Sequence, residues 1–292
     1  MQPKVVILGS SGFLGKALFQ YLYGSTDLSV RGFNSSTLDL TSPDCVDILC
    51  REATDGTILI VTARSRVGED PHESFSADIL IATNIARCLS RRRVKKCIYF
   101  SSLSVYGDSS TSLAITEDTP IAANSLYGVA KFAGECVLRQ AAQRRGTPMI
   151  TLRPCMVYGP GDTSQAYGPT RFIKAILEQG KVSVFGDGSE VRDYLFIRDL
   201  VRITGRLIFG DYEGTYNLAT GHSHSFHEIL SCLEKVATRS FRVIPEDRKM
   251  PKTDQRIDSR KLLAIIPGFP FVELEEGLGE SYKYFSTLLQ GA

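Results

Sequence analysis

Apolar residues in the first half of the chain follow two alternating patterns. Short apolar runs, typical of strands buried on both faces, alternate with longer segments in which apolar residues recur every three or four positions, as in a helix. The predicted strands are 5–8, 28–33, 57–61, 97–100 and 148–152, and the predicted helices are 13–23, 76–91 and 126–144. Strands that alternate with helices in this way predict an α/β fold built on a doubly wound parallel sheet with right-handed crossovers.

The pattern changes after about Pro154. Loops become longer and richer in glycine and proline, as at 158–162 and 185–188. Helices are predicted at 170–179, 198–209, 226–238 and 274–289. We therefore expect two domains, residues 1–154 and a smaller α/β cap at 155–292, with some segments of the second crossing back to the first.

Composition and charge exclude several classes of protein. Lys and Arg total 34 and Asp and Glu total 32, a formal net charge of +2, whereas nucleic-acid-binding proteins usually carry a strong basic excess. No run approaches the roughly 18 apolar residues that a membrane span needs. A strand pattern begins at Lys4 without a small-residue cleavage site, so we expect no signal peptide. These features predict a cytoplasmic protein that binds neither nucleic acid nor membrane.

The cysteines and histidines give little support to a metal site. The cysteines are odd in number and form no C-x-x-C pair, which favours buried free thiols over disulfides or metal ligands. They are Cys45, Cys50, Cys88, Cys97, Cys136, Cys155 and Cys232. His222, His224 and His227 are grouped, but Ser225 and Glu228 have the spacing of a capping box, so a loop and helix cap is favoured. The basic run 91–96 ends a predicted helix and is interpreted as a solvated patch.

A glycine-rich loop follows the first strand and opens the first helix. Gly9, Gly12 and Gly15 form the pattern G-x-x-G-x-x-G. The first glycine permits a tight turn, the second lets a pyrophosphate approach the backbone, and the third lets the helix pack on the strand. The phosphates would then meet the free N–H groups at the helix start. We predict a Rossmann-type dinucleotide site here, with further cofactor contacts from Ser11, Phe13, Leu14, Leu40 and Ala63.

The end of the second strand bears on the choice of cofactor. An acidic residue usually stands there and binds a ribose 2′-hydroxyl, but this chain has Asn34. An amide does not repel a 2′-phosphate, and Ser35, Ser36 and Arg31 are near enough to assist one. NADP(H) is therefore slightly favoured over NAD, although Asn34 and Ser35 could equally serve only the turn. Asp39 either contacts the adenine ring or caps the next helix.

A tyrosine and a lysine open the long helix at 126–144. Tyr127 and Lys131 are four residues apart and so share one helix face. A phenol has an ordinary pKa of about 10, and a nearby ammonium lowers such a value, which makes an acid/base catalyst. Lys131 could also reach the ribose hydroxyls of the cofactor. Ser102 leaves a buried strand at its carboxyl end, where α/β sheets bind ligands, and could bind the same substrate oxygen.

With these residues the chain resembles the extended short-chain dehydrogenase/reductases of the NAD-dependent epimerase/dehydratase family. The resemblance extends from Val5 to about Phe285 and includes the stretches 152–161, 186–194, 199–200 and 216–218. It implies a nucleotide-sugar substrate and assigns Ser102, Tyr127 and Lys131 to hydride transfer. By analogy to relatives, helices 126–144 and 274–289 are expected to support a homodimer.

The resemblance also assigns residues that bind the substrate. Arg192 is assigned to the diphosphate, and Arg248 is the second candidate for the same role. A salt bridge to Asp193 or Asp187 is the alternative for both. A guanidinium suits this role because its planar fork matches phosphate oxygens. Ser104 and Tyr158 are placed near the substrate, with packing as the alternative for Tyr158.

Departures from the family pattern narrow the chemistry. Family dehydratases carry an Asp-Glu pair where this chain has Leu103 and Ser104, decarboxylases use a glutamate there, and 3,5-epimerising reductases carry a cysteine at Ser104. What remains is hydride transfer at C4 of a sugar, as a 4-epimerase or a 4-ketoreductase. Met156 replaces an asparagine common near the substrate phosphates, which leaves room for a reductase of another carbonyl compound. A non-catalytic cofactor sensor is the third possibility.

Overall fold

The computed structural model describes residues 3–24, 27–65, 70–107, 114–164, 168–248 and 252–290. The chain forms two compact units. The first comprises the described residues within 1–108, 117–154 and 201–216, and the second those within 109–116, 155–200 and 217–292.

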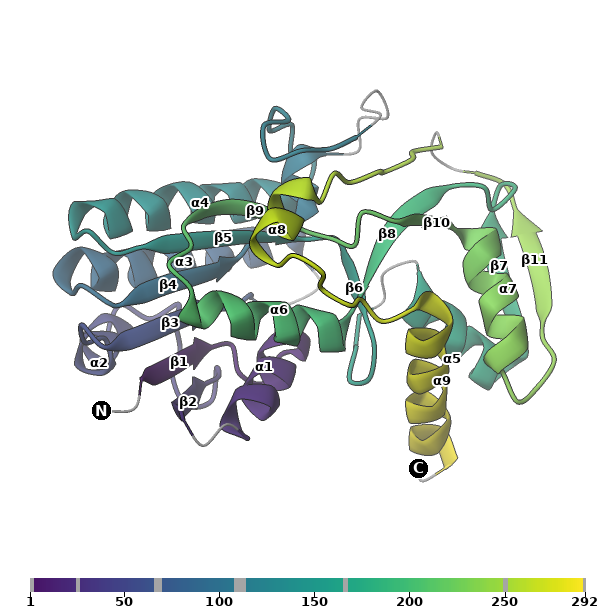
Figure 1. The fold of residues 1–292 in the computed structure, drawn as a ribbon, viewed down its shortest axis with the longest axis horizontal. Helices are drawn as coiled ribbons and strands as arrows, with labels where there is room; N and C mark the ends of the chain where they lie inside the picture. The colour runs from purple at the N-terminus through teal and green to yellow at the C-terminus, as the bar shows by residue number, and fades with distance from the viewer. Residues whose placement is uncertain are drawn as a thin grey trace. The chain divides into compact units, whose positions relative to one another are not determined.

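A six-stranded sheet with the order β2-β1-β3-β4-β5-β9 is the centre of the α/β fold (Figure 1). Its strands are β1 (Lys4–Leu8), β2 (Ser29–Phe33), β3 (Thr57–Val61), β4 (Lys96–Phe100), β5 (Met149–Pro154) and β9 (Gly214–Leu218). β1 pairs in parallel with β2 and β3, β3 with β4, and β4 with β5. Every residue of β3, β4 and β5 is buried, because helices cover both faces of the sheet. The predicted Rossmann-type fold is confirmed.

The helices of this fold largely match the hydrophobic pattern. They are α1 (Phe13–Tyr23), α2 (Cys45–Glu52), α3 (Pro71–Arg91), the 3-10 helix η1 (Leu103–Tyr106), α4 (Leu126–Arg144) and α6 (Ile197–Phe209). α1 and α4 have the predicted bounds, whereas α3 begins five residues earlier than predicted. Asp70 caps α3 by accepting a hydrogen bond from His72 N, with Pro71 in the first turn. No helix in the described ranges is long and apolar enough to cross a membrane.

The second unit contains two small sheets. Its strands are β6 (Met156–Tyr158), β7 (Lys181–Phe185), β8 (Val191–Phe196), β10 (Ser223–Ser225) and β11 (Arg242–Glu246), and its helices are α5 (Pro169–Gln179), α7 (Phe226–Val236), α8 (Arg260–Ile265) and α9 (Leu274–Gln290). One sheet has the order β10-β8-β6 and the other pairs β11 with β7. These short strands were not predicted. Two of them, β7 and β8, flank the glycine-rich loop at 186–190.

Lys96 corrects the prediction that the run 91–96 is a solvated patch. Its side chain is buried, and its ammonium donates to Leu207 O at 2.8 Å and to Gly210 O. Burial lowers the pKa of Lys96. The lysine therefore satisfies carbonyl groups at the C-terminal end of α6, where a cation is favoured by the helix dipole.

The thiols are free, but not all of them are buried. Cys45, Cys88, Cys97 and Cys155 are buried, Cys50 and Cys232 are half-buried, and Cys136 is exposed. Burial raises the pKa of the Cys97 thiol to about 12, which makes it unreactive at neutral pH. The expectation of buried thiols is thus wrong for Cys136, because the apolar spacing of α4 does not place that position against the sheet.

Candidate active site

The glycine-rich loop makes the turn from β1 into α1. Gly9 has a φ of +91°, and a Cβ there would lie 2.7 Å from the Ala63 backbone. A Cβ at Gly15 would lie only 2.1 Å from Gly9 O. Both positions therefore admit only glycine. Gly12 has an ordinary φ of −73° at the start of α1, and its N–H donates to Gly9 O at 3.1 Å. No side chain caps the helix, so the N–H groups of the first turn after Gly12 are available to an incoming ligand.

The segment after β2 is organised by local turns. Asn34 Oδ1 accepts hydrogen bonds from Ser36 N at 3.0 Å, Ser36 Oγ at 2.7 Å and Thr37 N at 3.1 Å. Ser35 is exposed. Arg31 is paired with Glu52 at 2.5 Å, which draws its charge away from the turn. Asn34 thus serves the turn, which was one of the two alternatives for this residue.

Asp39 forms a turn of its own. Its carboxylate accepts from Thr41 Oγ1 at 2.6 Å and from Thr41 N at 2.9 Å, and the Thr41 hydroxyl lowers the pKa of Asp39. Helix α2 begins at Cys45 with Asp44 in the cap position. The idea that Asp39 caps this helix is therefore wrong, while a contact with adenine stays a prediction.

The end of β4 carries the predicted catalytic serine. Ser102 caps the short helix η1: Ser104 N donates to Ser102 Oγ at 3.1 Å, and the two hydroxyl oxygens are 3.1 Å apart. α4 begins against η1, since a Cβ at Gly128 would lie 2.4 Å from Ser104 O. Ser125 caps α4 by accepting from Gly128 N. These caps bring the start of α4 to the carboxyl end of β4.

Tyr127 and Lys131 lie on one face of α4. The Lys131 ammonium is 5.9 Å from the centre of the Tyr127 ring and donates to Phe100 O at 2.9 Å. Lys131 is buried and Tyr127 is half-buried. The hydrogen bond to the end of β4 holds the lysine beside the tyrosine ring. A small cavity next to it is lined by Val61, Ala63, Asp78, Ile81, Ala82, Tyr99, Ala130 and Lys131, so Ala63 and Lys131, both predicted to contact the cofactor, share one space.

Arg64 was not found from the sequence. It follows β3, and its guanidinium lies 5.0 Å from the centre of the Tyr127 ring. Its position just beyond the carboxyl end of a parallel strand was the available signal, because ligand-binding residues gather there. The cation at this distance interacts with the π face of the ring.

A buried ion pair lies behind this face of α4. Arg153 on β5 donates to both oxygens of Glu135, at 2.9 and 2.7 Å, and to Tyr106 Oη at 2.6 Å. Ser101 Oγ donates to Glu135 Oε1 at 2.5 Å. Burial alone would lower the pKa of Arg153, but its bonds to Glu135 raise it above its usual range. The network connects α4, β5 and η1, the elements that carry or support Ser102, Tyr127 and Lys131.

The predicted substrate residues of the second unit have partners of their own. Tyr158 is 2% exposed and packs on Phe196 with ring centres 5.4 Å apart, which favours its packing alternative. Arg192 donates to Glu190 and to the carbonyls of Val191 and Thr253. Its predicted partners Asp193 and Asp187 are not among these contacts.

Arg248 donates to Asp187 Oδ1 and Glu190 Oε2, each at 2.9 Å. Burial works against the charge, but these two carboxylates raise the pKa of Arg248. Asp193 instead accepts hydrogen bonds from Thr220 and Gly221, and burial raises its pKa. The two arginines therefore meet at Glu190, a residue that the sequence did not single out.

The sequence model of the NAD dependent epimerase/dehydratase family matches residues 5–219. The chain belongs to this family. The prediction of an enzyme with a nicotinamide cofactor is thereby confirmed. A curated relative, GDP-6-deoxy-D-talose 4-dehydrogenase from Aggregatibacter actinomycetemcomitans, is 26% identical and covers 96% of this chain and 97% of its own.

Two solved structures of similar fold differ in the cofactor named with them. UDP-glucose 4-epimerase from Thermus thermophilus in complex with NAD has a TM-score of 0.84 at 24% identity and covers 97% of this chain and 98% of its own. RMD from Pseudomonas aeruginosa complexed with NADPH has a TM-score of 0.86 at 22% identity and covers 98% of this chain and 99% of its own. At these identities the likeness establishes the fold of this epimerase/dehydratase family member.

The histidine group of this family member is part of a helix cap. Ser225 Oγ accepts from Glu228 N at 3.2 Å, and Ser225 N donates to Glu228 Oε2 at 2.7 Å. The predicted capping box is therefore confirmed. His224 Nδ1 lies 3.7 Å from Glu228, and within the described ranges no group of three or more potential ligands is placed to hold a metal ion.

Proposed function

We propose that this protein transfers a hydride at C4 of a nucleotide-activated sugar, as a 4-epimerase or a 4-ketoreductase. The observation that carries the proposal is the gathering of Ser102, Tyr127 and Lys131 at the carboxyl end of β4. The name of the talose 4-dehydrogenase relative, which refers to position 4 of a GDP-sugar, supports the position of the reaction. Leu103 has no group that exchanges protons, which disfavours dehydration.

The first unit would hold the cofactor. The turn at Gly9 and Gly15 leaves backbone N–H groups for a pyrophosphate, and Lys131 and Ala63 share a cavity beside it. The features fit a nicotinamide dinucleotide, which when bound supplies or accepts the hydride. Lys131 would bind its ribose hydroxyls. The second unit would bind the nucleotide diphosphate through Arg192 and Arg248. Ser104, a residue of the first unit, would bind the sugar.

The proton chemistry belongs to this chain's own residues. Tyr127 would exchange a proton with the substrate oxygen, and Ser102 would donate a hydrogen bond to that oxygen. Phe100 O orients the Lys131 ammonium beside the Tyr127 ring. Arg64 adds a second cation near the same ring. Acid/base catalysis of this kind contributes about 10²–10⁴-fold to a rate.

A panel of UDP-, GDP- and dTDP-sugars and their 4-keto forms, with and without NADPH, tests the proposal. Turnover without added cofactor identifies an epimerase, and stoichiometric NADPH consumption identifies a reductase. Replacing Tyr127 with Phe should lower kcat by at least about 100-fold while leaving cofactor affinity nearly unchanged. A Lys131→Met variant should have both a lower kcat and a lower cofactor affinity. Lack of turnover in folded protein with bound cofactor, or an active Tyr127→Phe variant, contradicts the proposal.

We further propose that NADP(H) is accepted and slightly preferred. The amide oxygen of Asn34 is used by Ser36 and Thr37, which leaves the Nδ2 donors to a phosphate. No carboxylate stands at this position to repel it. Titration of the protein with NADPH and NADH, followed by nucleotide fluorescence, measures the preference. NADH affinity at least tenfold higher than that of NADPH contradicts it.

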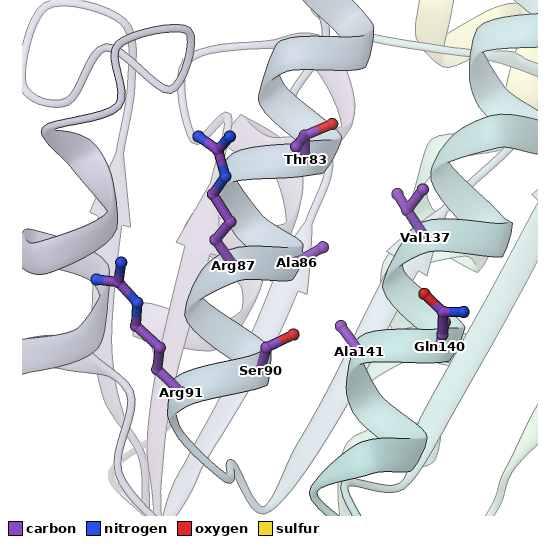
Figure 2. A pocket seen from close by; sticks show the side chains of 8 residues that line it. All are labelled: Thr83, Ala86, Arg87, Ser90, Arg91, Val137, Gln140 and Ala141. Atoms are coloured by element: carbon purple, nitrogen blue, oxygen red, sulfur yellow. The ribbon is translucent and has the colours of Figure 1, made fainter.

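The same unit offers a surface for a homodimer. A groove of about 290 Å³ lies between α3 and α4 and is lined by Thr83, Ala86, Arg87, Ser90, Arg91, Val137, Gln140 and Ala141. Figure 2 shows Ala86 and Ser90 of α3 projecting toward α4, while Arg87 and Arg91 extend to the other side. The lining includes the small or apolar side chains of Ala86, Val137 and Ala141, against which helices of a second copy would pack.

A further inference from the structure

Glu190 lies at the centre of a charged cluster in the second unit. One carboxylate oxygen accepts from Arg192 Nη2, and the other accepts from Arg248 Nη1 at 2.9 Å. The side chains of Glu190, Arg192 and Arg248 are 15%, 15% and 21% exposed. Asp187, the other partner of Arg248, is 71% exposed. Glu190 is thus the inner anion and Asp187 the outer one.

Like charges explain why an anion is needed at this point. Two guanidinium groups that approach one place repel each other unless a negative charge lies between them. Lys252, next to Thr253 in the chain, also forms an ion pair, since its ammonium lies 3.2 Å from Asp254. Each of these three cations has a carboxylate partner, so an anionic ligand that approaches the same guanidinium groups competes with these carboxylates for charge-assisted bonds.

The arginines have contacts that do not depend on Glu190. Arg192 Nη1 donates to Val191 O at 2.9 Å and to Thr253 O. Arg248 lies over Gly186, where a Cβ would be 2.1 Å from its Nε, and keeps its bond to Asp187. Both guanidinium groups would therefore stay near their present positions when the carboxylate of Glu190 moves away.

We propose that Glu190 is an internal counter-anion that occupies the diphosphate site of the free enzyme and is displaced by the substrate. The inference rests on the proposed function, in which Arg192 and Arg248 bind the diphosphate. Because Glu190 offers one negative charge to two cations, a ligand with two or more negative charges competes best. Glu190 therefore lowers the affinity for every nucleoside diphosphate and favours ligands that reach both arginines.

The test measures nucleotide affinity and needs no knowledge of the sugar. UDP, GDP, ADP and dTDP are titrated by calorimetry into the wild-type protein and into Glu190→Gln, which keeps the side-chain shape. The tightest-binding nucleotide should bind about three- to tenfold more tightly to Glu190→Gln, because partly exposed ion pairs of this kind are modest in strength. Arg192→Ala should bind it more weakly than wild type.

Asp187→Asn is the matched control. It removes one negative charge from the same arginine cluster, but at the exposed outer position. Its nucleotide affinity should therefore differ less than twofold from that of wild type. Circular dichroism and a second variant, Glu190→Ala, separate a folding defect from a binding effect. Both Glu190 variants should bind the nucleotide more tightly than wild type.

Three results would overturn the inference. Equal or weaker nucleotide binding by both Glu190 variants means that the carboxylate orients the arginines instead of competing with the ligand. An equal gain in Asp187→Asn means a general charge effect. Failure of wild type and variants alike to bind any of the nucleotides removes the nucleotide-sugar function together with this inference, whereas in the first two results that function stands.

Discussion

Gly15 brings α1 so close to β1 that no side chain fits between them. The nearest atoms to a Cβ would be Gly9 O at 2.1 Å and Thr62 Oγ1 at 2.7 Å. Gly9 O belongs to the backbone of the turn and cannot move aside as a flexible side chain can. Any side chain would therefore displace the start of the helix, and with it the N–H groups proposed to hold the cofactor phosphates.

Replacing Gly15 with alanine should destabilise the protein by about 1–3 kcal/mol through overpacking and weaken cofactor binding at least tenfold. Thermal unfolding with and without NADPH measures both effects. Gly24 is the control, because its Cβ would meet only ordinary contacts at 3.9 Å, so Gly24→Ala should leave cofactor affinity unchanged. An unaltered cofactor-induced rise in Tm for Gly15→Ala would contradict the steric argument.

At the scale of residues, the sequence predicted contacts that depend on local geometry. Tyr127 and Lys131 were expected on one face because four residues span about one helical turn, and Ser225 and Glu228 because a capping box has a fixed spacing. Arg64 and Glu190 were missed because their partners come from distant parts of the chain or from a strand that was not predicted. Tertiary structure alone sets such contacts.

The buried pair Glu135–Arg153 fixes α4 against β5. Glu135 is 0% and Arg153 4% exposed. Arg139 also lies 3.7 Å from Glu135, but the bidentate contact with Arg153 is the closer compensation for the buried carboxylate. Lys131 lies one turn before Glu135 on α4, and Ser101 of the network precedes Ser102. The position of the candidate catalytic face is therefore coupled to an ion pair that does not contact the substrate oxygen in the proposed reaction.

Replacing Arg153 with methionine should cost about 3–5 kcal/mol of unfolding free energy, because the buried Glu135 carboxylate loses its bidentate partner and keeps only the Ser101 hydroxyl and the more distant Arg139. The double variant Glu135→Met, Arg153→Met should recover most of this loss. Urea unfolding of wild type, Glu135→Met, Arg153→Met and the double variant completes this double-mutant cycle. Additive losses in the double variant would show that the two charges do not depend on each other.

The capping box of α7 should make stability depend on acid pH. Hydrogen bonds from Ser225 N–H and its hydroxyl lower the pKa of Glu228 below its ordinary value of 4.5. The unfolded chain then binds the proton more readily, so this contribution is present above about pH 4.5 and is lost as pH falls through the lower folded value. The Glu228 side chain is 58% exposed, which limits the effect to less than about 1 kcal/mol.

Glu228→Gln keeps the capping geometry but does not titrate. The difference in unfolding free energy between wild type and Glu228→Gln should be constant from pH 7 to 5.5 and shrink between about pH 5 and 3. Urea unfolding across this range measures it. A difference that stays constant down to pH 3 would contradict a role for the carboxylate charge.

At the scale of elements, periodicity predicted long helices better than short strands. α1 and α4 have the predicted bounds because their apolar faces repeat over several turns. β8 was missed because it lies directly after a glycine-rich loop, and the eight-residue α2 because two turns show too little periodicity. Lys96 was misassigned because the acceptors that bury it lie in a helix more than a hundred residues later.

The whole molecule carries a net charge of only +2. With so small a global field, association with the proposed anionic substrate would depend on placed groups such as Arg192 and Arg248. Association of two copies would not be opposed by strong charge repulsion. Figure 2 shows the candidate dimer groove, in which Val137 of α4 is 37% exposed. A charge at that position would have to be buried in the proposed homodimer.

Light scattering after size exclusion should give twice the mass of 32.2 kDa for the wild type and about one chain mass for Val137→Asp, because burying an unpaired carboxylate is costly. Leu289→Asp, on the exposed side of α9, tests whether that helix contributes as well. A monomeric wild type, or a Val137→Asp variant that stays dimeric, would contradict packing at this groove.

The discontinuity of the first unit also constrains the order in which the protein can be made. Lys96 and its acceptor Leu207 O are 111 residues apart, and the edge strand β9 begins only at Gly214. When residues 1–154 have left the ribosome, most strands of the sheet are present. The carbonyls that bind the Lys96 ammonium and the strand β9 are still missing. An unpaired buried ammonium is costly. Completion of the first unit thus waits until residues 155–200, which belong to the second unit, have been synthesised, whereas residues 217–292 of the second unit follow it.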